Sequence, residues 1–309
     1  MVIHKQKNIF REIAKEISRA KNILFLTHRA PDGDAVGSVL ALNFYLKKKK
    51  KNTLLYILGA PHFLDFLPNF QDIRTKSPKK NNFDIVFALD YAGEERLQVP
   101  PGFSLDKSKV ISIDHHPTGR RIGKIKLILS PVSSTCEILY YFFKSIKFNI
   151  DKNLATCLLV GMFTDTAGFA FMNRKSEKIA SEIIKKGGEL SRIVRRYNSF
   201  SLPRARLLAK MISRIKREKD TDILWSWLAF NDFREEKEKD FLQEPPTFPD
   251  FLSYIDRAKV HLFLIQYKNG KVKGSLRSRE NVDVSKIAEK LGGGGHKSAS
   301  GFKTSGTID

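Results

Sequence analysis

The chain has 309 residues, of which 41% are hydrophobic, so it can bury the cores of two domains. It has only two cysteines, Cys136 and Cys157, which excludes a disulfide-stapled scaffold and is typical of the reducing cytoplasm. Its 55 basic and 33 acidic residues give a net charge of +22, which favours a nucleotide or nucleic-acid substrate, although a lysine-rich proteome would give the same balance.

No membrane or export segment is predicted. The first 17 residues carry charges throughout and lack the apolar core of a signal peptide. Their Ile9, Phe10, Ile13 and Ile17 predict an amphipathic helix. The most apolar helical stretch, 154–163, is too short to span a bilayer. We therefore expect a cytoplasmic protein that does not engage a membrane.

Strand and helix patterns alternate in the first half of the chain. The predicted strands are 23–27, 54–58, 84–89 and 110–113, and the predicted helices are 35–47 and 135–147. This alternation predicts an α/β fold with a largely parallel sheet and helices on both faces. Further helices are predicted near 151–163, 176–187 and 191–217.

A second, smaller α/β domain is predicted in the last third of the chain. Its strands are 223–229, 260–266 and 271–276, followed by a helix at 284–291 that runs into four glycines. A polar insert (234–240) and a turn with Pro245, Pro246 and Pro249 separate the first two strands. We expect domains at 1–190 and 218–309, joined by a helical connection at 191–217.

Residues with ligand-type side chains follow three predicted strands and one predicted helix. They are His28, Asp32 and Asp34 after the first strand, Asp90 after the third, Asp114, His115 and His116 after the fourth, and Asp165 after helix 151–163. Ligands of open α/β sheets bind beyond the carboxyl ends of strands, so these side chains should converge. Asp34 alone would serve equally as a helix cap, but clustered carboxylates repel one another unless cations neutralise them.

The predicted ligand set combines oxygen and imidazole and has no thiolate. It suits manganese or magnesium, with iron or cobalt as alternatives, better than structural zinc. Six ligands with one bridging carboxylate would hold two divalent ions. Two such ions would stabilise the attacking and leaving oxygens of a phosphoryl displacement.

The motifs resemble those of a known superfamily along nearly the whole chain. THRAPDGDAVGS, the aspartate of ALDYA, IDHHP and FTDTAGF resemble the four motifs of the DHH phosphoesterases, although DTAGF replaces the expected DTG and aromatic. Near the C-terminus, GSLRS and GGGGHKSASGF resemble the DHHA1 substrate-binding domain. The order of motifs and the length resemble the bacterial nanoRNase group of oligoribonucleases and pAp phosphatases, where pAp is 3′-phosphoadenosine 5′-phosphate.

The resemblance implies a role for each site residue. One metal would be held by His28, Asp32 and Asp90, and the other by Asp34, Asp90, His115 and Asp165. Asp114 would orient a histidine ligand, and His116 would face the scissile phosphate. The substrate would be bound in the second domain by Arg277, Ser278, Gly294, Gly295 and His296, where consecutive glycine amides favour anions.

The implied activity is hydrolysis of short oligoribonucleotides to nucleoside 5′-monophosphates. Removal of the 3′-phosphate of pAp is a second activity that the resemblance leaves open. Whether the protein forms a homodimer is also left open. A cyclic- or linear-dinucleotide phosphodiesterase is the nearest alternative. A single-strand exonuclease is disfavoured by the short chain, and a pyrophosphatase by the glycine-rich motif. A non-catalytic nucleic-acid-binding protein would have no use for the complete set of ligands.

Overall fold

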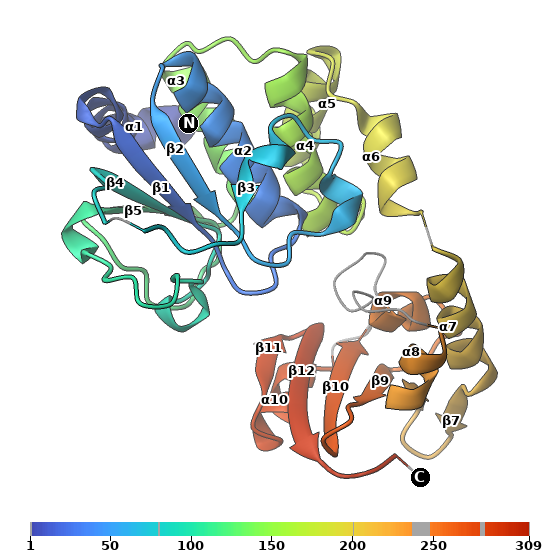
Figure 1. The fold of residues 1–309 in the computed structure, drawn as a ribbon. Coiled ribbons are helices and arrows are strands. Elements are labelled where there is room, and N and C mark those ends of the chain that lie inside the picture. Colours follow the sequence, from blue (N-terminus) through green and yellow to red (C-terminus); the bar gives the residue numbers. More distant parts are fainter. Residues whose placement is uncertain (1, 80, 200, 237–247, 279–281, 309) are drawn as a thin grey trace. The chain divides into compact units, whose positions relative to one another are not determined.

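The computed structural model describes residues 2–79, 81–199, 201–236, 248–278 and 282–308 (Figure 1). The chain forms two compact units, Met1–Arg196 (unit 1) and Tyr197–Asp309 (unit 2). The division lies near the end of helix α6 (Leu190–Tyr197), before helix α7 (Leu202–Ser213). The helical connection predicted at 191–217 is therefore two helices, because Ser201 caps a new helix that has Pro203 in its first turn.

The sheet of unit 1 has six strands in the order β3-β2-β1-β4-β5-β6, all paired in parallel. The strands are β1 (Asn22–Leu26), β2 (Asn52–Tyr56), β3 (Ile73–Arg74), β4 (Ile85–Leu89), β5 (Val110–Asp114) and β6 (Ile125–Ile128). The four predicted strands are confirmed, with β2 two residues earlier. Strands β3 and β6 were not predicted because each is too short to show a clear pattern.

The two faces of this sheet are covered differently (Figure 1). The α-helices of unit 1 are α1 (Val2–Arg19), α2 (Gly33–Lys48), α3 (Thr135–Ser145), α4 (Lys152–Asp165), α5 (Arg174–Lys185) and α6. Helices α2 and α3 pack against the strands on one face. The segment 91–109 lies on the other face and contains short 3-10 helices at Glu94–Arg96 and Lys107–Lys109. It adds Leu97 and Phe103 to the hydrophobic cluster that contains Leu24. Two further 3-10 helices are His62–Leu64 and Phe70–Asp72.

Helices α2 and α4 approach closely because glycines lie in their contact. A Cβ on Gly37 would lie 2.7 Å from the carbonyl oxygen of Cys157. A Cβ on Gly161 would lie 2.3 Å from Cys136 Sγ and 2.4 Å from Asp34 Oδ1. Because α2 carries Asp34 and α4 ends at Asp165, this contact fixes the separation of two predicted ligands.

Replacing Gly161 with alanine should therefore damage both stability and the predicted site. We expect the free energy of unfolding to fall by about 1–3 kcal/mol, the usual cost of overpacking, despite alanine's better helix propensity. Displacement of Asp34 should also weaken manganese binding, measured by calorimetry. Unchanged unfolding and unchanged manganese affinity in G161A would show that the α2–α4 contact is looser than described.

Unit 2 contains a second six-stranded sheet in the order β11-β12-β10-β9-β8-β7. The strands are β7 (Lys216–Glu218), β8 (Ile223–Leu228), β9 (Val260–Gln266), β10 (Lys271–Ser278), β11 (Gly294–His296) and β12 (Ala299–Ser305). Strands β8 and β9 pair in parallel, and the other neighbours pair antiparallel. The three predicted strands are confirmed. Strands β11 and β12 were missed because their glycine, alanine and lysine residues have low strand propensity.

Helices α7, α8 (Phe230–Glu236) and α9 (Phe248–Ser253) form one core with β8 and β9, and α10 (Val284–Lys290) packs on the opposite face. The smaller α/β domain is therefore confirmed. The polar insert predicted at 234–240 is helical up to Glu236, and its remainder lies outside the described residues, as do Pro245 and Pro246. Pro249 lies in the first turn of α9, where a missing N–H is tolerated.

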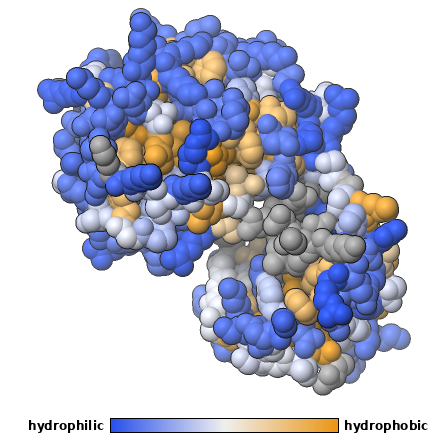
Figure 2. Space-filling view, in the orientation of Figure 1, coloured by the Kyte–Doolittle hydropathy of each residue, from blue (hydrophilic) through white to orange (hydrophobic). Residues whose placement is uncertain are grey.

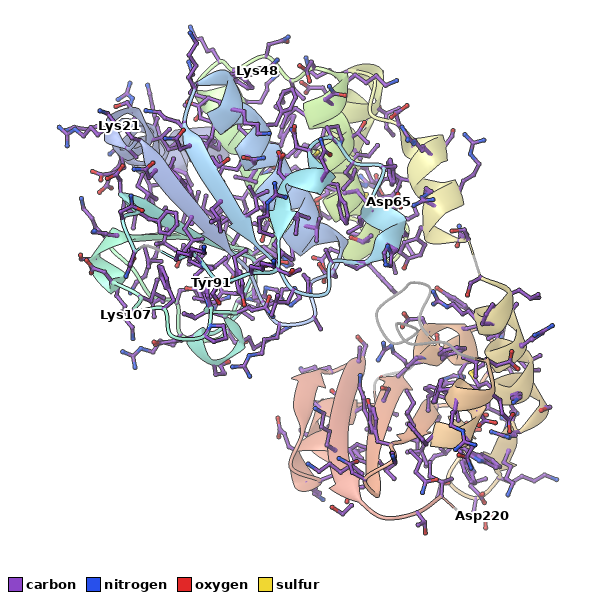
Figure 3. All side chains as sticks on the ribbon, in the orientation of Figure 1. Lys21, Lys48, Asp65, Tyr91, Lys107 and Asp220 are labelled. Atoms are coloured by element: carbon purple, nitrogen blue, oxygen red, sulfur yellow. The ribbon has the colours of Figure 1, made fainter. Side chains whose placement is uncertain are left out.

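The surface of unit 1 is largely hydrophilic on the face shown in Figure 2. In Figure 3 the exposed Lys21, Lys48 and Lys107 lie at its periphery, whereas Tyr91 is fully buried inside it. Both cysteines are buried and free of disulfides. Among the described residues, none of the helices combines the length and the apolar character needed to cross a bilayer.

Candidate active site

The ends of three strands and one helix bring the six predicted metal ligands together in unit 1. Their ligand atoms, with those of His116, form three groups within which the atoms lie no more than 4.8 Å apart. These groups are His28, Asp32 and Asp90; Asp90, His115 and His116; and Asp34, His115 and Asp165. The convergence expected from the parallel sheet is therefore observed.

His28 follows β1 and is held with one ring nitrogen facing the cluster. Its Nδ1–H donates to the Arg29 carbonyl oxygen at 2.9 Å. Its Nε2 lies 3.9 Å from Asp32 Oδ2 and 3.8 Å from Asp90 Oδ2. Burial lowers the pKa of His28, but the two carboxylates outweigh burial and raise it to about 9. A backbone carbonyl on the other nitrogen is the usual support of a metal-binding imidazole.

Both aspartates of the first motif also bind helix N-termini. Asp32 caps α2 and accepts from the backbone N–H groups of Asp34 at 2.9 Å and Ala35 at 3.1 Å. The buried Asp34 carboxylate accepts from the N–H groups of Thr135 at 2.6 Å and Cys136 at 2.9 Å, where α3 begins. Capping and metal binding are compatible, because each carboxylate oxygen has more than one lone pair.

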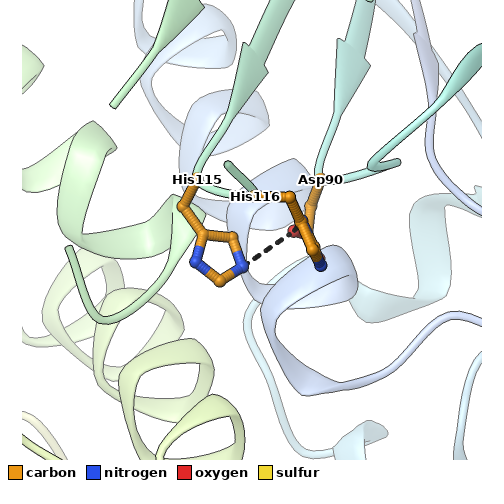
Figure 4. A group of neighbouring side chains, drawn as sticks. All are labelled: Asp90, His115 and His116. Carbon is orange, nitrogen blue, oxygen red and sulfur yellow. Dashed lines mark ion pairs between the residues drawn. The ribbon is translucent and has the colours of Figure 1, made fainter. Parts of the chain in front are cut away.

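Asp90 lies at the centre of the cluster, directly after β4 (Figure 4). Its backbone is left-handed, with φ of 51°, a conformation that is uncommon outside glycine and clusters at functional sites. Its Oδ1 accepts from Thr135 Oγ1 at 3.1 Å and lies 3.6 Å from both His115 Nε2 and His116 Nδ1. Burial, reinforced by the neighbouring Asp34 charge, raises the pKa of Asp90 to about 7.

His115 supplies the observation that best tests whether a cation fits here. Its Nε2 is buried and lies 3.1 Å from Asp165 Oδ2, yet it has no hydrogen-bond partner among the described residues. Burial lowers the pKa of His115 and raises that of Asp165. A neutral imidazole lone pair beside the Asp90 and Asp165 carboxylates fits a divalent metal ion, which would satisfy the nitrogen and neutralise the carboxylates.

Asp114, the last residue of β5, anchors the loop that follows it. Its Oδ1 accepts from the backbone N–H and from Nδ1–H of His116 at 3.0 and 2.8 Å. Its Oδ2 accepts from the N–H groups of Tyr91 and Ala92 and from Arg121 Nε. These contacts hold the pKa of Asp114 far below its usual range although burial opposes them. The histidine that Asp114 contacts is therefore His116, and not a predicted metal ligand.

Sequence reasoning missed two side chains of this site. The buried Arg121 donates to the carbonyl oxygens of His116 and Gly119 at 2.5 and 2.6 Å, besides its ion pair with Asp114. Thr135 donates to Asp90 across 45 positions of sequence. Arginine and threonine are common at loop ends, so neither carries a signal that a single sequence reveals.

In unit 2 two of the predicted substrate-binding side chains, Arg277 and Ser278, already have protein partners. Arg277 Nε donates to Asp250 Oδ1 at 2.8 Å, a partner that was not predicted. Ser278 Oγ donates to the Val282 carbonyl oxygen at 2.7 Å. The backbone of His296 belongs to β11, but its side chain lies outside the described residues.

The glycine run has a structural role that was not foreseen. The N–H groups of Gly292 and Gly293 donate to carbonyl oxygens of α10, so they end that helix and do not face an anion. A Cβ on Gly295 would lie 2.6 Å from the Ala299 carbonyl oxygen, so the close pairing of β11 with β12 requires glycine there. Gly294 has open space around its Cα, and its predicted substrate role stays a prediction.

The raised carboxylate pKa values predict how stability depends on pH. The pKa of Asp34 is raised to about 6 and that of Asp90 to about 7, from about 3.9 in an unfolded chain. A carboxyl group whose pKa is higher in the folded protein than in the unfolded chain stabilises the fold while it is protonated. This contribution to the free energy of unfolding is full below about pH 4 and is lost as the pH rises through 6 and 7. The melting temperature of the chelated protein should therefore fall from pH 5 to pH 8, by scanning calorimetry.

Two controls identify the source of that slope. The chelated D90N variant should show a shallower fall, because one of the titrating carboxyls is gone. Added manganese should raise the melting temperature more at pH 8 than at pH 5, because protons compete with the metal. Equal slopes for wild type and D90N would contradict the assignment to this cluster.

Comparison with known proteins agrees with both units. The DHH family N-terminal domain model matches residues 22–162, and the DHHA1 domain model matches residues 246–308. The bifunctional oligoribonuclease and PAP phosphatase NrnA of Thermus thermophilus is 31% identical over 288 residues, which cover 92% of this chain and 84% of that protein. A probable NrnA of Streptococcus mutans is 25% identical over 298 residues, covering 94% and 92%.

A solved structure extends the likeness to the fold. The exopolyphosphatase-related protein from Bacteroides fragilis superimposes with a TM-score of 0.86 at 27% identity, covering 98% of this chain and 92% of that one. The motifs, the ligand cluster and these relatives agree over nearly the full length. The chain belongs to the DHH family of phosphoesterases, with a DHH domain followed by a DHHA1 domain.

Proposed function

We propose that this protein hydrolyses short oligoribonucleotides to nucleoside 5′-monophosphates and removes the 3′-phosphate of pAp, in the cytoplasm. The names of the two relatives support the substrate class. The observation that carries the chemistry is the buried His115 Nε2, which lacks a hydrogen-bond partner among the described residues and lies beside Asp165 and Asp90. A buried nitrogen that lacks a hydrogen-bond partner beside two carboxylates suits a divalent cation.

Two divalent ions fit the donor set. One set of ligands is His28, Asp32 and Asp90, and the other is Asp34, Asp90, His115 and Asp165, with Asp90 shared. Mixed oxygen and imidazole donors favour manganese, with magnesium, cobalt and iron as alternatives. When bound, such ions activate water and stabilise the charge that develops on the phosphoryl oxygens.

The protein's own residues position the substrate phosphate. Burial lowers the pKa of His116, but the hydrogen bond from its Nδ1–H to Asp114 outweighs burial and raises it. A protonated His116 can donate from Nε2 to a phosphate oxygen. Arg121 donates a hydrogen bond to the carbonyl oxygen of His116 and so holds this loop in place. The Nε2 donor of His116 is therefore oriented before the substrate arrives.

In unit 2 we assign substrate binding to Arg277, Ser278, Gly294, Gly295 and His296. Asp250 fixes Arg277 through Nε. Arginine has five N–H donors, so a fixed guanidinium retains donors for a phosphate. R277K should raise KM more than it lowers kcat if this contact is equal in the ground and transition states.

The proposal is tested by turnover in manganese on a panel of substrates. We expect cleavage of 5′-phosphorylated dinucleotides and of pAp, with a kcat/KM for dinucleotides above that for a twenty-nucleotide strand. Cyclic di-AMP and pyrophosphate are the comparison substrates. Preferred hydrolysis of cyclic di-AMP would favour the dinucleotide phosphodiesterase alternative. Processive degradation of the long strand would favour the exonuclease alternative.

A further inference from the structure

A pocket of 730 Å³ lies in unit 2 beside the turn between β9 and β10. Its lining consists of Phe230, Tyr267, Val272, Asn269, Lys268, Lys271 and Lys303. Three of these residues are lysines, and the described lining includes no carboxylate. None of these residues belongs to the ligand cluster of unit 1 or to the substrate-binding set assigned above.

The walls and the rim of this pocket differ in chemistry. Phe230 begins α8 and Tyr267 follows β9, and both are half-buried, with Tyr267 packed against the core of unit 2. The exposed Lys271 and Lys303 come from the adjacent strands β10 and β12. Aromatic walls bind flat apolar rings, and ammonium groups at the rim bind anions. A nucleobase joined to a phosphate combines both features.

The pocket lies at one end of a row of positively charged side chains. Lys271, Lys273 and Arg277 alternate along β10, so their side chains share one face of the sheet, and Lys303 pairs with Lys273 across the strands. Burial, followed by repulsion from Lys303 and Arg277, lowers the pKa of Lys273. Crowded cations of this kind are stabilised by an anion. The row spans about 20 Å from Lys271 to Arg277, so a ligand that contacts both ends must be longer than a mononucleotide.

We propose that this pocket binds one nucleobase and its adjoining phosphate from a single-stranded oligonucleotide, as a subsite separate from Arg277. The base stacks on Tyr267 and Phe230, and the phosphate pairs with Lys303 and Lys271. The rest of the strand follows the lysine row toward Arg277. This assignment adds a substrate subsite to the proposed function. It rests on that function for the expectation that the bound strand is RNA.

The test measures binding without turnover, by titration calorimetry of the full-length chelated protein with hexa-adenylate, ApA and AMP. Two variants probe the pocket, K303E at the rim and Y267L at the wall. The matched control is K290E, because the exposed Lys290 lies on α10, which packs on the other face of the sheet, and the change in charge is identical. We expect K303E and Y267L to weaken hexa-adenylate binding about tenfold or more, and K290E to change it less than twofold.

The same titrations can overturn the assignment. If K303E and K290E weaken hexa-adenylate binding equally, net charge alone explains the effect and the pocket is rejected as a subsite. AMP binding that weakens in K303E as much as hexa-adenylate binding would show that the lysine row adds nothing to binding, and would reject the path of the strand toward Arg277. Binding of ApA and its manganese-dependent hydrolysis should stay within twofold of wild type in all three variants. Failure of wild-type hydrolysis would reject the proposed function, whereas the calorimetry tests the pocket independently of turnover.

Discussion

Replacing Asp90 with asparagine should reduce phosphoesterase turnover by at least about a thousandfold. Asp90 is shared between both ligand sets and lies 3.6–3.8 Å from nitrogens of three histidines. Metal ions stabilise the charge of the phosphoryl-transfer transition state by several kcal/mol. Each 1.36 kcal/mol removed from the activation free energy raises the rate tenfold. Losing the shared ligand should therefore remove most of the rate, measured as release of AMP from pApA in manganese.

The D90N variant should nevertheless fold. Asparagine keeps the shape of the side chain and tolerates the left-handed backbone at this position. Removing a buried charge should raise the melting temperature of the chelated protein at pH 8. The control is D106N, because Asp106 is an exposed aspartate of unit 1 remote from the cluster, and its turnover should be normal. A folded D90N protein with near-normal rates would refute the shared-ligand arrangement.

Replacing Asp114 with alanine should lower the free energy of unfolding by about 3–5 kcal/mol, the cost of breaking a buried ion pair from one side. Asp114 is fully buried and pairs with the buried Arg121. The variant also leaves the N–H groups of Tyr91 and Ala92 without their acceptor. Urea denaturation of the chelated protein measures this loss without interference from metal binding.

A double-mutant cycle separates the ion pair from the other contacts of Asp114. In D114A/R121M the uncompensated guanidinium is removed, so the loss should be smaller than the sum of the two single losses by about 0.5–3 kcal/mol. D114N should be intermediate, because an amide keeps an acceptor oxygen but not the charge. Strict additivity of D114A and R121M would mean that Arg121 is held by its carbonyl partners alone.

The ligands of the candidate site were predictable because the parallel sheet makes their convergence a matter of topology. His28, Asp90 and Asp114 each follow or end an apolar run long enough to be recognised as a strand. Parallel strands end at one edge, so their terminal residues meet whatever the details of packing. The DHH motifs then assign the same residues by resemblance. The fold class and the two units follow from the same alternation of patterns.

The contacts that orient these ligands were not predictable. The bonds from Thr135 to Asp90 and from the α3 amides to Asp34 join positions 45 and about 100 residues apart, and they depend on how α3 packs. The Arg277–Asp250 pair depends on α9, a six-residue helix with little sequence pattern. The glycines before His296 were expected to offer their backbone N–H groups to an anion. Instead, Gly294 and Gly295 pair with β12 as part of strand β11.

The central claim is that the aspartate and histidine cluster of unit 1 holds metal ions that hydrolyse short oligoribonucleotides with water. The most direct test is cleavage of pApA in ¹⁸O-labelled water, with manganese or with excess chelator, followed by mass spectrometry of the products. We predict manganese-dependent formation of two AMP molecules per pApA, one carrying a single solvent oxygen on its phosphate. Equal cleavage in chelator, or a 2′,3′-cyclic phosphate among the products, would contradict the account.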